Sequence, residues 1–441
     1  MRGDPAVLRS AAFYIPLSAA LAIAWHKRPD RARIAGAALA TLWAAAALLA
    51  MHPIAVAAGW WDYDVDGATI AGLPADLWLG WSLVWGALPV LLTDRFRWSS
   101  LLALLWLDLL VMPALTPVVL LGPRWFVGDV AVAIVALLPA AALGSWTANR
   151  ERLPLRATMQ CLVFSGLVLG VFTTLALEHT GGSWRALRTW HGSGASILAQ
   201  LIAIAAIPGI AAVIRFARDG GGTPFPWDPP ERLVRTGPYA FVANPMQVSM
   251  VLVVLGWACA LRSFGVAALA ITGAAFAAGI AAWHEHAELE SRLGQTWTAY
   301  RGDVRVWVPH LRPRVAGLGH LYVAADCATC RSVARWFARR DPVSLLLLPA
   351  EPAMRRITYV DPNGRRREGV GGVAGALEHL HLGWALLGWT ADLPFVTGAM
   401  QLIVDAVGGG PRSIVPSDGR SPAVGCESCH STISDRGPAL E

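Results

Sequence analysis

The sequence has few charged residues and almost no lysine. Charged residues make up 15% of the 441 residues and hydrophobic residues 55%, whereas an ordinary soluble domain carries about 25% charged residues. This composition excludes an ordinary soluble fold for the whole chain. Because the apolar excess lies before residue 285, we expect a multi-spanning membrane protein with a soluble tail. Lys27 is the only lysine, and this preference for arginine suggests a GC-rich bacterial gene.

The first apolar run also lacks a small-residue cleavage site, which argues against a cleaved signal peptide. The basic segment Lys27–Arg33 follows that run and would retain it in the membrane. The net charge of +6 is explained by cytoplasmic loops of a membrane protein, so we expect no nucleic-acid partner.

Apolar runs of roughly 17–25 residues can cross a bilayer, and the sequence has about nine of them. They lie at about 11–26, 34–58, 72–92, 99–122, 126–146, 157–178, 194–215, 243–261 and 264–284. Basic loops such as 94–97 and 149–156 fall on one side of this series, and the acidic loop 61–66 falls on the other. We therefore expect a bacterial inner-membrane protein with its N-terminus outside and everything after residue 285 in the cytoplasm.

A polar stretch at 228–246, the first polar stretch, separates two apolar runs. Gly237-Pro238 predicts a fixed turn. Asn244-Pro245 predicts a helix start, with Asn as N-cap and Pro at the first helical position. The N–H groups and dipole of that helix would favour an anion. The alternative is that both pairs only mark the membrane interface.

A second polar stretch, 285–300, follows one helical hairpin later. Leu289, Leu293 and Trp297 recur every four residues, which predicts the buried face of a helix. Glu285 lies on that face, where a carboxylate needs a partner. The candidates are Arg235 and a cationic group of a ligand; alternatively, Glu285 reaches the interface from the helix end.

These two stretches resemble the integral-membrane methyltransferases of the isoprenylcysteine carboxyl methyltransferase and phospholipid methyltransferase superfamily, over about residues 194–312. The residues that carry the resemblance are Asp228-Pro-Pro230, Gly237-Pro-Tyr239, Asn244-Pro-Met246, Glu285, Leu293-Gly294, Trp297 and Tyr300. The chain departs from the family pattern at three positions. Ala243 replaces an Arg, Gln247 replaces a Tyr or small residue, and His286 replaces a second acid.

The resemblance implies S-adenosylmethionine bound between helices near the cytoplasmic face and a lipophilic acceptor that enters from the bilayer. The acceptor would be an isoprenylcysteine-like carboxylate, a phospholipid amine or another membrane-borne substrate, such as a prenylated small molecule or peptide. The implied catalytic residues are Glu285 and Arg235. The implied cofactor-binding residues are Gly237, Pro238, Tyr239, Asn244, Pro245, Met246, Glu285 and Tyr300. Methyl transfer is a direct displacement that needs positioning and exclusion of water rather than a covalent nucleophile.

The tail predicts an α/β domain with strands at 320–325, 344–348 and 357–360 and a helix at 331–340. Cys327 and Cys330 form a Cys-x-x-Cys pair at the first strand-to-helix turn, a thioredoxin-like arrangement. We expect the helix N-terminus to lower the pKa of the Cys327 thiol, which makes Cys327 the nucleophile and Cys330 the resolving partner. The segment resembles the DCC family of thiol–disulfide oxidoreductases over about 317–430, which implies a thiol redox partner.

Cys426-Glu-Ser-Cys429-His430 has the spacing of c-type haem attachment. A zinc site built with the first pair and a second exchanging dithiol are alternatives. We expect no metal site and S-adenosylmethionine, rather than haem or zinc, as the cofactor.

The expected domains are 1–156 (membrane helices without a motif), 157–316 (methyltransferase-like), 317–412 (thioredoxin-like) and 413–441 (tail). Two rival functions stay open. One is a membrane-anchored thiol–disulfide oxidoreductase with an inactive methyltransferase-like half, and the other is a c-type cytochrome-like electron carrier.

Overall fold

The computed structural model describes residues 4–314, 317–351 and 354–411, without the side chains of 280–281 and 284–288. The chain divides into two compact units. We call Met1–Ala316 with His381–Thr390 the membrane unit, and Gly317–Leu380 with Ala391–Glu441 the C-terminal unit.

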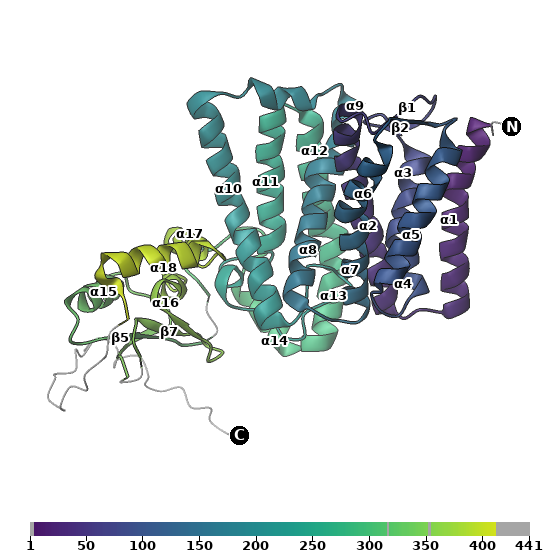
Figure 1. The fold of residues 1–441 in the computed structure, drawn as a ribbon. Coiled ribbons are helices and arrows are strands. Elements are labelled where there is room, and N and C mark those ends of the chain that lie inside the picture. Colours follow the sequence, from purple (N-terminus) through teal and green to yellow (C-terminus); the bar gives the residue numbers. More distant parts are fainter. Residues whose placement is uncertain (1–3, 315–316, 352–353, 412–441) are drawn as a thin grey trace. The chain divides into compact units, whose positions relative to one another are not determined.

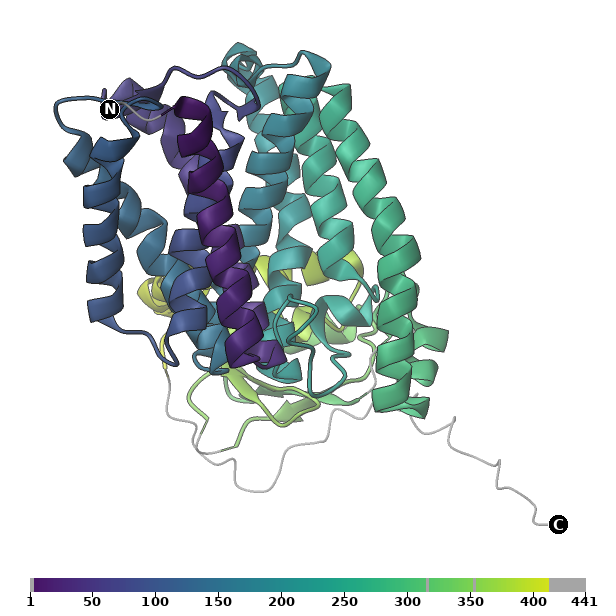
Figure 2. The same ribbon diagram turned by 90° about the vertical axis from the view of Figure 1, so that its right-hand side faces the viewer.

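The membrane unit is a bundle of helices that run side by side in two views a quarter-turn apart (Figures 1 and 2). Its first elements are α1 (Pro5–Lys27), α2 (Arg31–Ala57), β1 (Trp61–Tyr63), β2 (Thr69–Ile70), β3 (Leu73–Pro74), α3 (Ala75–Ser82), η1 (Leu83–Ala87), α4 (Leu88–Leu92), α5 (Trp98–Val111), η2 (Met112–Leu115), β4 (Val119–Leu121), α6 (Trp125–Val135) and α7 (Leu137–Ala148). They are followed by α8 (Leu153–Gly166), η3 (Leu167–Phe172), α9 (Thr173–Thr180), η4 (Trp184–Thr189), α10 (Gly192–Arg215), η5 (Phe216–Gly220), η6 (Gly237–Ala240), α11 (Pro245–Leu261), α12 (Phe264–Phe276), η7 (Ala277–Ala281), α13 (Ala282–Leu293) and α14 (Gln295–Asp303).

Within the described residues, 7 helices or runs of helix are long and apolar enough to cross a membrane. They are Pro5–Lys27, Arg31–Ala57, Ala75–Leu92, Trp98–Leu115, Trp125–Ala148, Leu153–Thr180 and Gly192–Gly220. These helices are consistent with the predicted multi-helix membrane protein. The last two expected spans correspond to the shorter apolar helices Pro245–Leu261 and Phe264–Gly279.

Helix α2 forms the centre of the N-terminal helices, and small residues let its neighbours approach closely. A Cβ added to Gly36 would lie 2.4 Å from the backbone oxygen of Gly144 in α7, so neither helix has room for a larger residue at this crossing. Leu39 and Ala40 beside this contact are fully buried. Packing through small residues replaces the hydrophobic effect as the main attraction between membrane helices.

The two ends of the bundle differ in chemistry. At one end, three basic loops contact each other: Lys27 donates to the Leu92 carbonyl (2.7 Å), Arg33 to the Thr93 carbonyl (2.7 Å) and Asn149 to the Asp94 carbonyl (3.2 Å). At the other end, β1 pairs antiparallel with β4, and β2 with β3. Figure 1 shows β1 and β2 at the top of this unit and α13 and α14 at the bottom.

The C-terminal unit has a four-stranded sheet in the order β6-β5-β7-β8. Strands β5 and β6 are parallel, while β5–β7 and β7–β8 are antiparallel. Its elements are β5 (Gly319–Val323), α15 (Ala328–Ala338), β6 (Leu345–Pro349), β7 (Thr358–Val360), β8 (Arg366–Glu368), α16 (Gly369–Leu377), α18 (Val396–Val404) and η8 (Asp405–Gly409). The predicted strands and helix of the tail are confirmed.

Helix α17 (Leu382–Ala391) differs from the expected domain boundaries. Residues 381–390 group with the membrane unit rather than with the chain on either side of them. Ala385 and Trp389 are buried, and the Trp389 ring packs edge-on against Phe241 at 5.5 Å. The backbone N–H of Leu382 donates to the Leu311 carbonyl (2.8 Å). The apolar run after residue 381 forms helix α17. The sequence alone does not reveal where the turns of this helix pack.

Candidate functional site

The start of the first polar stretch folds against the glycine-rich end of η5. The backbone N–H of Glu231 donates to the Gly220 carbonyl (2.7 Å), and that of Thr223 donates to the Asp228 carbonyl (3.0 Å). A Cβ on Gly222 would lie 2.7 Å from Pro230. The Asp-Pro-Pro segment is thus held by close backbone packing on the Gly220–Gly222 turn.

Asp228 forms a buried ion pair with Arg156 of α8. The closest nitrogen and oxygen are 3.0 Å apart, and the Arg156 side chain is only 4% exposed. The Thr223 hydroxyl also donates to the Asp228 carboxylate (2.9 Å). Sequence reasoning did not single out Arg156, because its partner lies far along the chain, beyond α10 and η5. This pair ties the first polar stretch to the preceding helices.

A second buried polar group precedes the predicted turn. The Asp219 carboxylate accepts from the Thr236 hydroxyl (3.0 Å) and lies 3.9 Å from the Arg215 guanidinium. Gly237 follows with φ +61, and a Cβ there would lie 3.0 Å from Arg215 Cγ. Glycine is therefore required at 237 for both conformation and space. Arg215 and Asp219 were not among the predicted site residues, although their i,i+4 spacing beside Gly220 was a signal.

The predicted turn at Gly237-Pro238 is confirmed, because η6 forms a single 3₁₀ turn there. Tyr239 is buried and packs against Phe216 and Met246. The Tyr300 hydroxyl donates to the Tyr239 carbonyl (2.9 Å). Tyr300, a predicted cofactor-binding residue, thus holds the backbone of the turn.

Helix α11 begins at Pro245, as predicted, with Asn244 at the N-cap position. The predicted capping bond is wrong: the Asn244 side chain makes no cap hydrogen bond and instead donates to the Gln247 side chain (3.1 Å). The physical reason is its backbone conformation, φ −115 and ψ 59, which departs from the extended geometry of a capping residue. The first turn of α11 therefore has no side-chain cap from Asn244.

The second polar stretch is broken at Gly294, where α13 ends and α14 begins. The expectation of one continuous helix is wrong, since Gly294 has φ 53 and ψ −132. The buried face is nevertheless confirmed. Leu289 and Trp297 are buried and cluster with Ala243 of the first stretch.

Polar contacts also join the two stretches. Arg235 donates to the Thr296 carbonyl (2.7 Å) and Arg292 to the Pro230 carbonyl (3.1 Å). Arg235 is therefore engaged with the second stretch through its backbone. The structure brings together the two segments that the sequence singled out.

Two groups of predicted residues cannot be placed in this way. Glu285 lies within α13, but its side chain lies outside the described part of the structure. Cys426, Cys429 and His430 also lie outside the described residues.

The chain after α14 returns across the first stretch as an extended clasp, residues 305–314. The backbone N–H groups of Ala243 and Asn244 donate to the carbonyls of Arg305 (2.8 Å) and Val306 (3.2 Å), respectively. In return, the backbone N–H of His310 donates to the Phe241 carbonyl (2.8 Å). Burial lowers the pKa of the His310 imidazole, and the positive charges of Arg305 and Arg314 lower it further. The clasp fixes the backbone that leads into α11.

The start of α11 is suited to an anionic group of a ligand. The N-terminus of α11 offers backbone N–H groups and a positive dipole end to a carboxylate. A Cβ at Gly237 would meet the Arg215 side chain, so a larger residue has no room here. A separate cavity, lined by residues between Leu48 and Val132, lies among the N-terminal helices. Within the described residues, no group of three or more His, Cys, Asp or Glu side chains could hold a metal ion.

In the C-terminal unit, Cys327 caps α15: its Sγ accepts a hydrogen bond from the Cys330 N–H (3.2 Å). Cys327 is buried and Cys330 is half-buried. A sulfur that accepts from a helix N-terminus is electrostatically favoured as thiolate. The dithiol thus has the local geometry of an exchanging pair.

One family of known proteins matches part of this chain. The family model for phospholipid methyltransferase matches residues 188–296, from η4 to the first turn of α14. No curated protein and no solved structure matches the chain significantly. The match includes both polar stretches up to Thr296 and covers less than half of the chain. This segment of the membrane unit is similar to phospholipid methyltransferases, which supports a membrane-embedded methyltransferase with a lipophilic acceptor.

Proposed function

We propose that this protein transfers a methyl group from S-adenosylmethionine to a lipophilic acceptor where the two polar stretches meet. The observation that carries the proposal is their convergence inside the segment that the family model matches. The acceptor is an isoprenylcysteine-like carboxylate, a phospholipid amine or another small membrane substrate.

The chain's own groups would position the reaction. The N-terminus of α11 would take the carboxylate of the donor, and Glu285 would face its cationic groups. Arg235 would act as a positioning residue, because its guanidinium already holds α14 through the Thr296 carbonyl. The donor supplies an electrophilic methyl carbon on a positively charged sulfur. As the acceptor oxygen or nitrogen bonds to that carbon, the carbon–sulfur bond breaks and its electron pair stays on sulfur.

The membrane setting supports a lipophilic acceptor, which would reach the site along α10 and α11 from the bilayer. Holding donor and acceptor in line is worth about 7–11 kcal/mol of the barrier in favourable cases, so positioning alone is a sufficient strategy. We further propose a bacterial inner-membrane location with the N-terminus outside. The mutual contacts of the basic loops support placing them together on the cytoplasmic side.

The test is transfer of labelled methyl from S-adenosylmethionine in membranes that contain the full-length protein, compared between wild type, Glu285→Gln and Glu290→Gln. Glu290 is exposed on the same helix and serves as the matched control. We expect label in a lipid or prenylated fraction, a loss of about 100-fold or more in Glu285→Gln, and near wild-type transfer in Glu290→Gln. Equal transfer in both variants would remove Glu285 from the site. No transfer and no donor binding by wild type would contradict the proposal.

We also propose that Cys327 and Cys330 exchange thiols with a disulfide-bearing partner. The N-cap hydrogen bond to Cys327 Sγ supports this role, as does the strand–helix–parallel strand unit that carries the pair in a thioredoxin-like manner. The Cys327 thiolate would attack a partner disulfide, one partner thiolate would leave, and Cys330 would release the second from the mixed disulfide. Trapping tests it: Cys330→Ser should accumulate a mixed disulfide and Cys327→Ser should not.

A further inference from the structure

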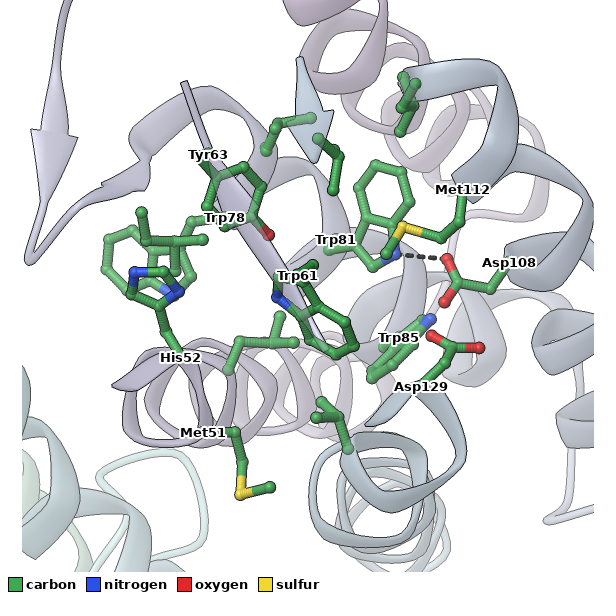
Figure 3. A pocket seen from close by; sticks show the side chains of 16 residues that line it. Met51, His52, Trp61, Tyr63, Trp78, Trp81, Trp85, Asp108, Met112 and Asp129 are labelled. Atoms are coloured by element: carbon green, nitrogen blue, oxygen red, sulfur yellow. Dashed lines mark hydrogen bonds between the residues drawn. The ribbon is translucent and has the colours of Figure 1, made fainter. Parts of the chain in front are cut away.

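A cavity of about 50 Å³ lies among the N-terminal helices, beneath the β1–β4 ribbon. Its walls come from the ends of α2, α3, η1, α5 and α6, together with β1 and β4 (Figure 3). It therefore lies at the end of the bundle opposite α13 and α14 (Figure 1). The family match does not reach these helices.

Two carboxyl groups face this cavity, each from a helix in which it is the only charged side chain. Asp108 of α5 is 4% exposed and Asp129 of α6 is 2% exposed. Figure 3 shows their carboxyl groups turned toward each other on one side of the cavity. The Trp81 indole N–H donates to Asp108 Oδ1 (2.5 Å). The two carboxyl groups are close enough to hydrogen-bond each other through a shared proton, whereas Oδ2 of each accepts no hydrogen bond from any other described residue.

The charge of this pair is not balanced by the cavity wall. The described residues that line it include no lysine or arginine, and His52 is their only basic side chain. Two carboxylates at membrane depth are costly unless a cation or a shared proton compensates them. An intramembrane ionisable residue is by default a candidate for function.

The remaining walls are aromatic. Trp61, Tyr63, Trp78, Trp81 and Trp85 line the cavity (Figure 3). Aromatic faces attract organic cations, by about 2 kcal/mol or more when the cation is desolvated. Indole and phenyl groups are poor ligands for Mg²⁺ or Ca²⁺, which require six or more oxygen atoms. The donor set therefore suits an ammonium group rather than a metal ion.

The chain segment that carries Trp61 and Tyr63 is acidic. Asp62, Asp64 and Asp66 are exposed in the segment that begins with β1. Burial raises the pKa of the Tyr63 hydroxyl, and the negative charges of Asp108 and Asp62 raise it further. The negative charges of Asp62 and Asp108 therefore act on Tyr63 in the cavity wall and favour a cationic ligand there.

We propose that this cavity binds the ammonium group of a small amine, with Asp108 and Asp129 as its counter-ions and the tryptophans as its cage. The ammonium is either that of a free amine or that of a lipid head group. The site is separate from the proposed methyl-transfer site, so the two proposals stand or fall independently.

The test is calorimetric titration of the full-length protein in phosphatidylglycerol nanodiscs with ethanolamine and with tetramethylammonium. Wild type is compared with Asp108→Asn, Asp129→Asn and the control Asp94→Asn, in which the exchanged carboxylate is 91% exposed and lies away from the cavity. We expect saturable binding, weakened about 10-fold or more by either buried substitution and less than about 2-fold by the control. Nanodiscs that contain phosphatidylethanolamine distinguish the sources: competition with added ethanolamine identifies a head-group ligand, and its absence a free amine.

The proposal would be overturned if neither probe showed saturable binding, or if all variants bound the probes with equal affinity. A proton shared by Asp108 and Asp129 would then compensate the negative charge of the pair. If a buried substitution prevents folding, wild type alone decides the question. A hydrophobic carbodiimide should modify Asp108 or Asp129, as read by mass spectrometry, and tetramethylammonium should protect them. Modification that tetramethylammonium does not slow would also overturn the proposal.

Discussion

The matched segment and the N-terminal helices use their polar residues in opposite ways. In the matched segment, polar residues form contiguous stretches, and some of them hold backbone: Arg235 holds the Thr296 carbonyl and Arg292 the Pro230 carbonyl. In the N-terminal helices, Asp108 and Asp129 are isolated within apolar runs, and they meet on one side of a cavity. The polar stretches of this protein thus hold backbone segments in place, whereas the isolated buried acids are candidates for binding a cation.

The Arg156–Asp228 pair joins the two regions, and its loss should have the largest effect. Asp228→Asn leaves the buried Arg156 cation without its counter-ion. We expect a destabilisation of about 3–5 kcal/mol, measured as a lower midpoint of thermal unfolding in detergent. The matched control is Asp94→Asn, whose side chain is 91% exposed in its pair with Arg33; it should cost less than about 1 kcal/mol. Equal shifts of the unfolding midpoint in the two variants would contradict this prediction, because the buried pair would then stabilise the fold no more than the exposed one.

Tyr300→Phe sharpens the contrast between framework and ligand contact. Removing the buried hydroxyl deprives the Tyr239 carbonyl of a donor, so we expect about 1–3 kcal/mol of destabilisation together with slower methyl transfer. Tyr14→Phe, at a residue 61% exposed, is the control. Unchanged stability with a raised KM for the methyl donor would instead place the Tyr300 hydroxyl on the ligand.

The smallest expected effect is a pH dependence in the clasp. The pKa of His310 is lowered by burial and by the charges of Arg305 and Arg314. The unfolded chain, with an ordinary histidine pKa of about 6.5, therefore takes up the proton more readily. Stability should fall as the pH drops below about 6.5. His310→Gln should reduce this slope when unfolding midpoints are measured at about pH 7.5 and 5.5. An unchanged slope would assign the pH dependence to other groups.

Local chemistry made much of the architecture readable. The apolar runs predicted the membrane helices, Gly237-Pro238 the turn, Asn244-Pro245 the start of α11, and the tail pattern the strands β5, β6 and β7. These features depend on neighbouring residues and on the period of the element. The break at Gly294 was missed because a four-residue repeat continues across it while the backbone there adopts a positive φ.

The sequence by itself determined that this protein is a bundle of membrane helices with two polar stretches and a dithiol at a strand-to-helix turn, since hydrophobic length, turn residues and cysteine spacing are local properties. Only the tertiary structure decided that Arg156 pairs with Asp228, that α17 packs on Phe241, and that Asp108 and Asp129 share one aromatic cavity. Each of these is a contact between segments far apart in the chain. Which helix faces which is settled by packing, as at Gly36 and Gly144, and apolar runs of similar composition do not encode it in any short stretch.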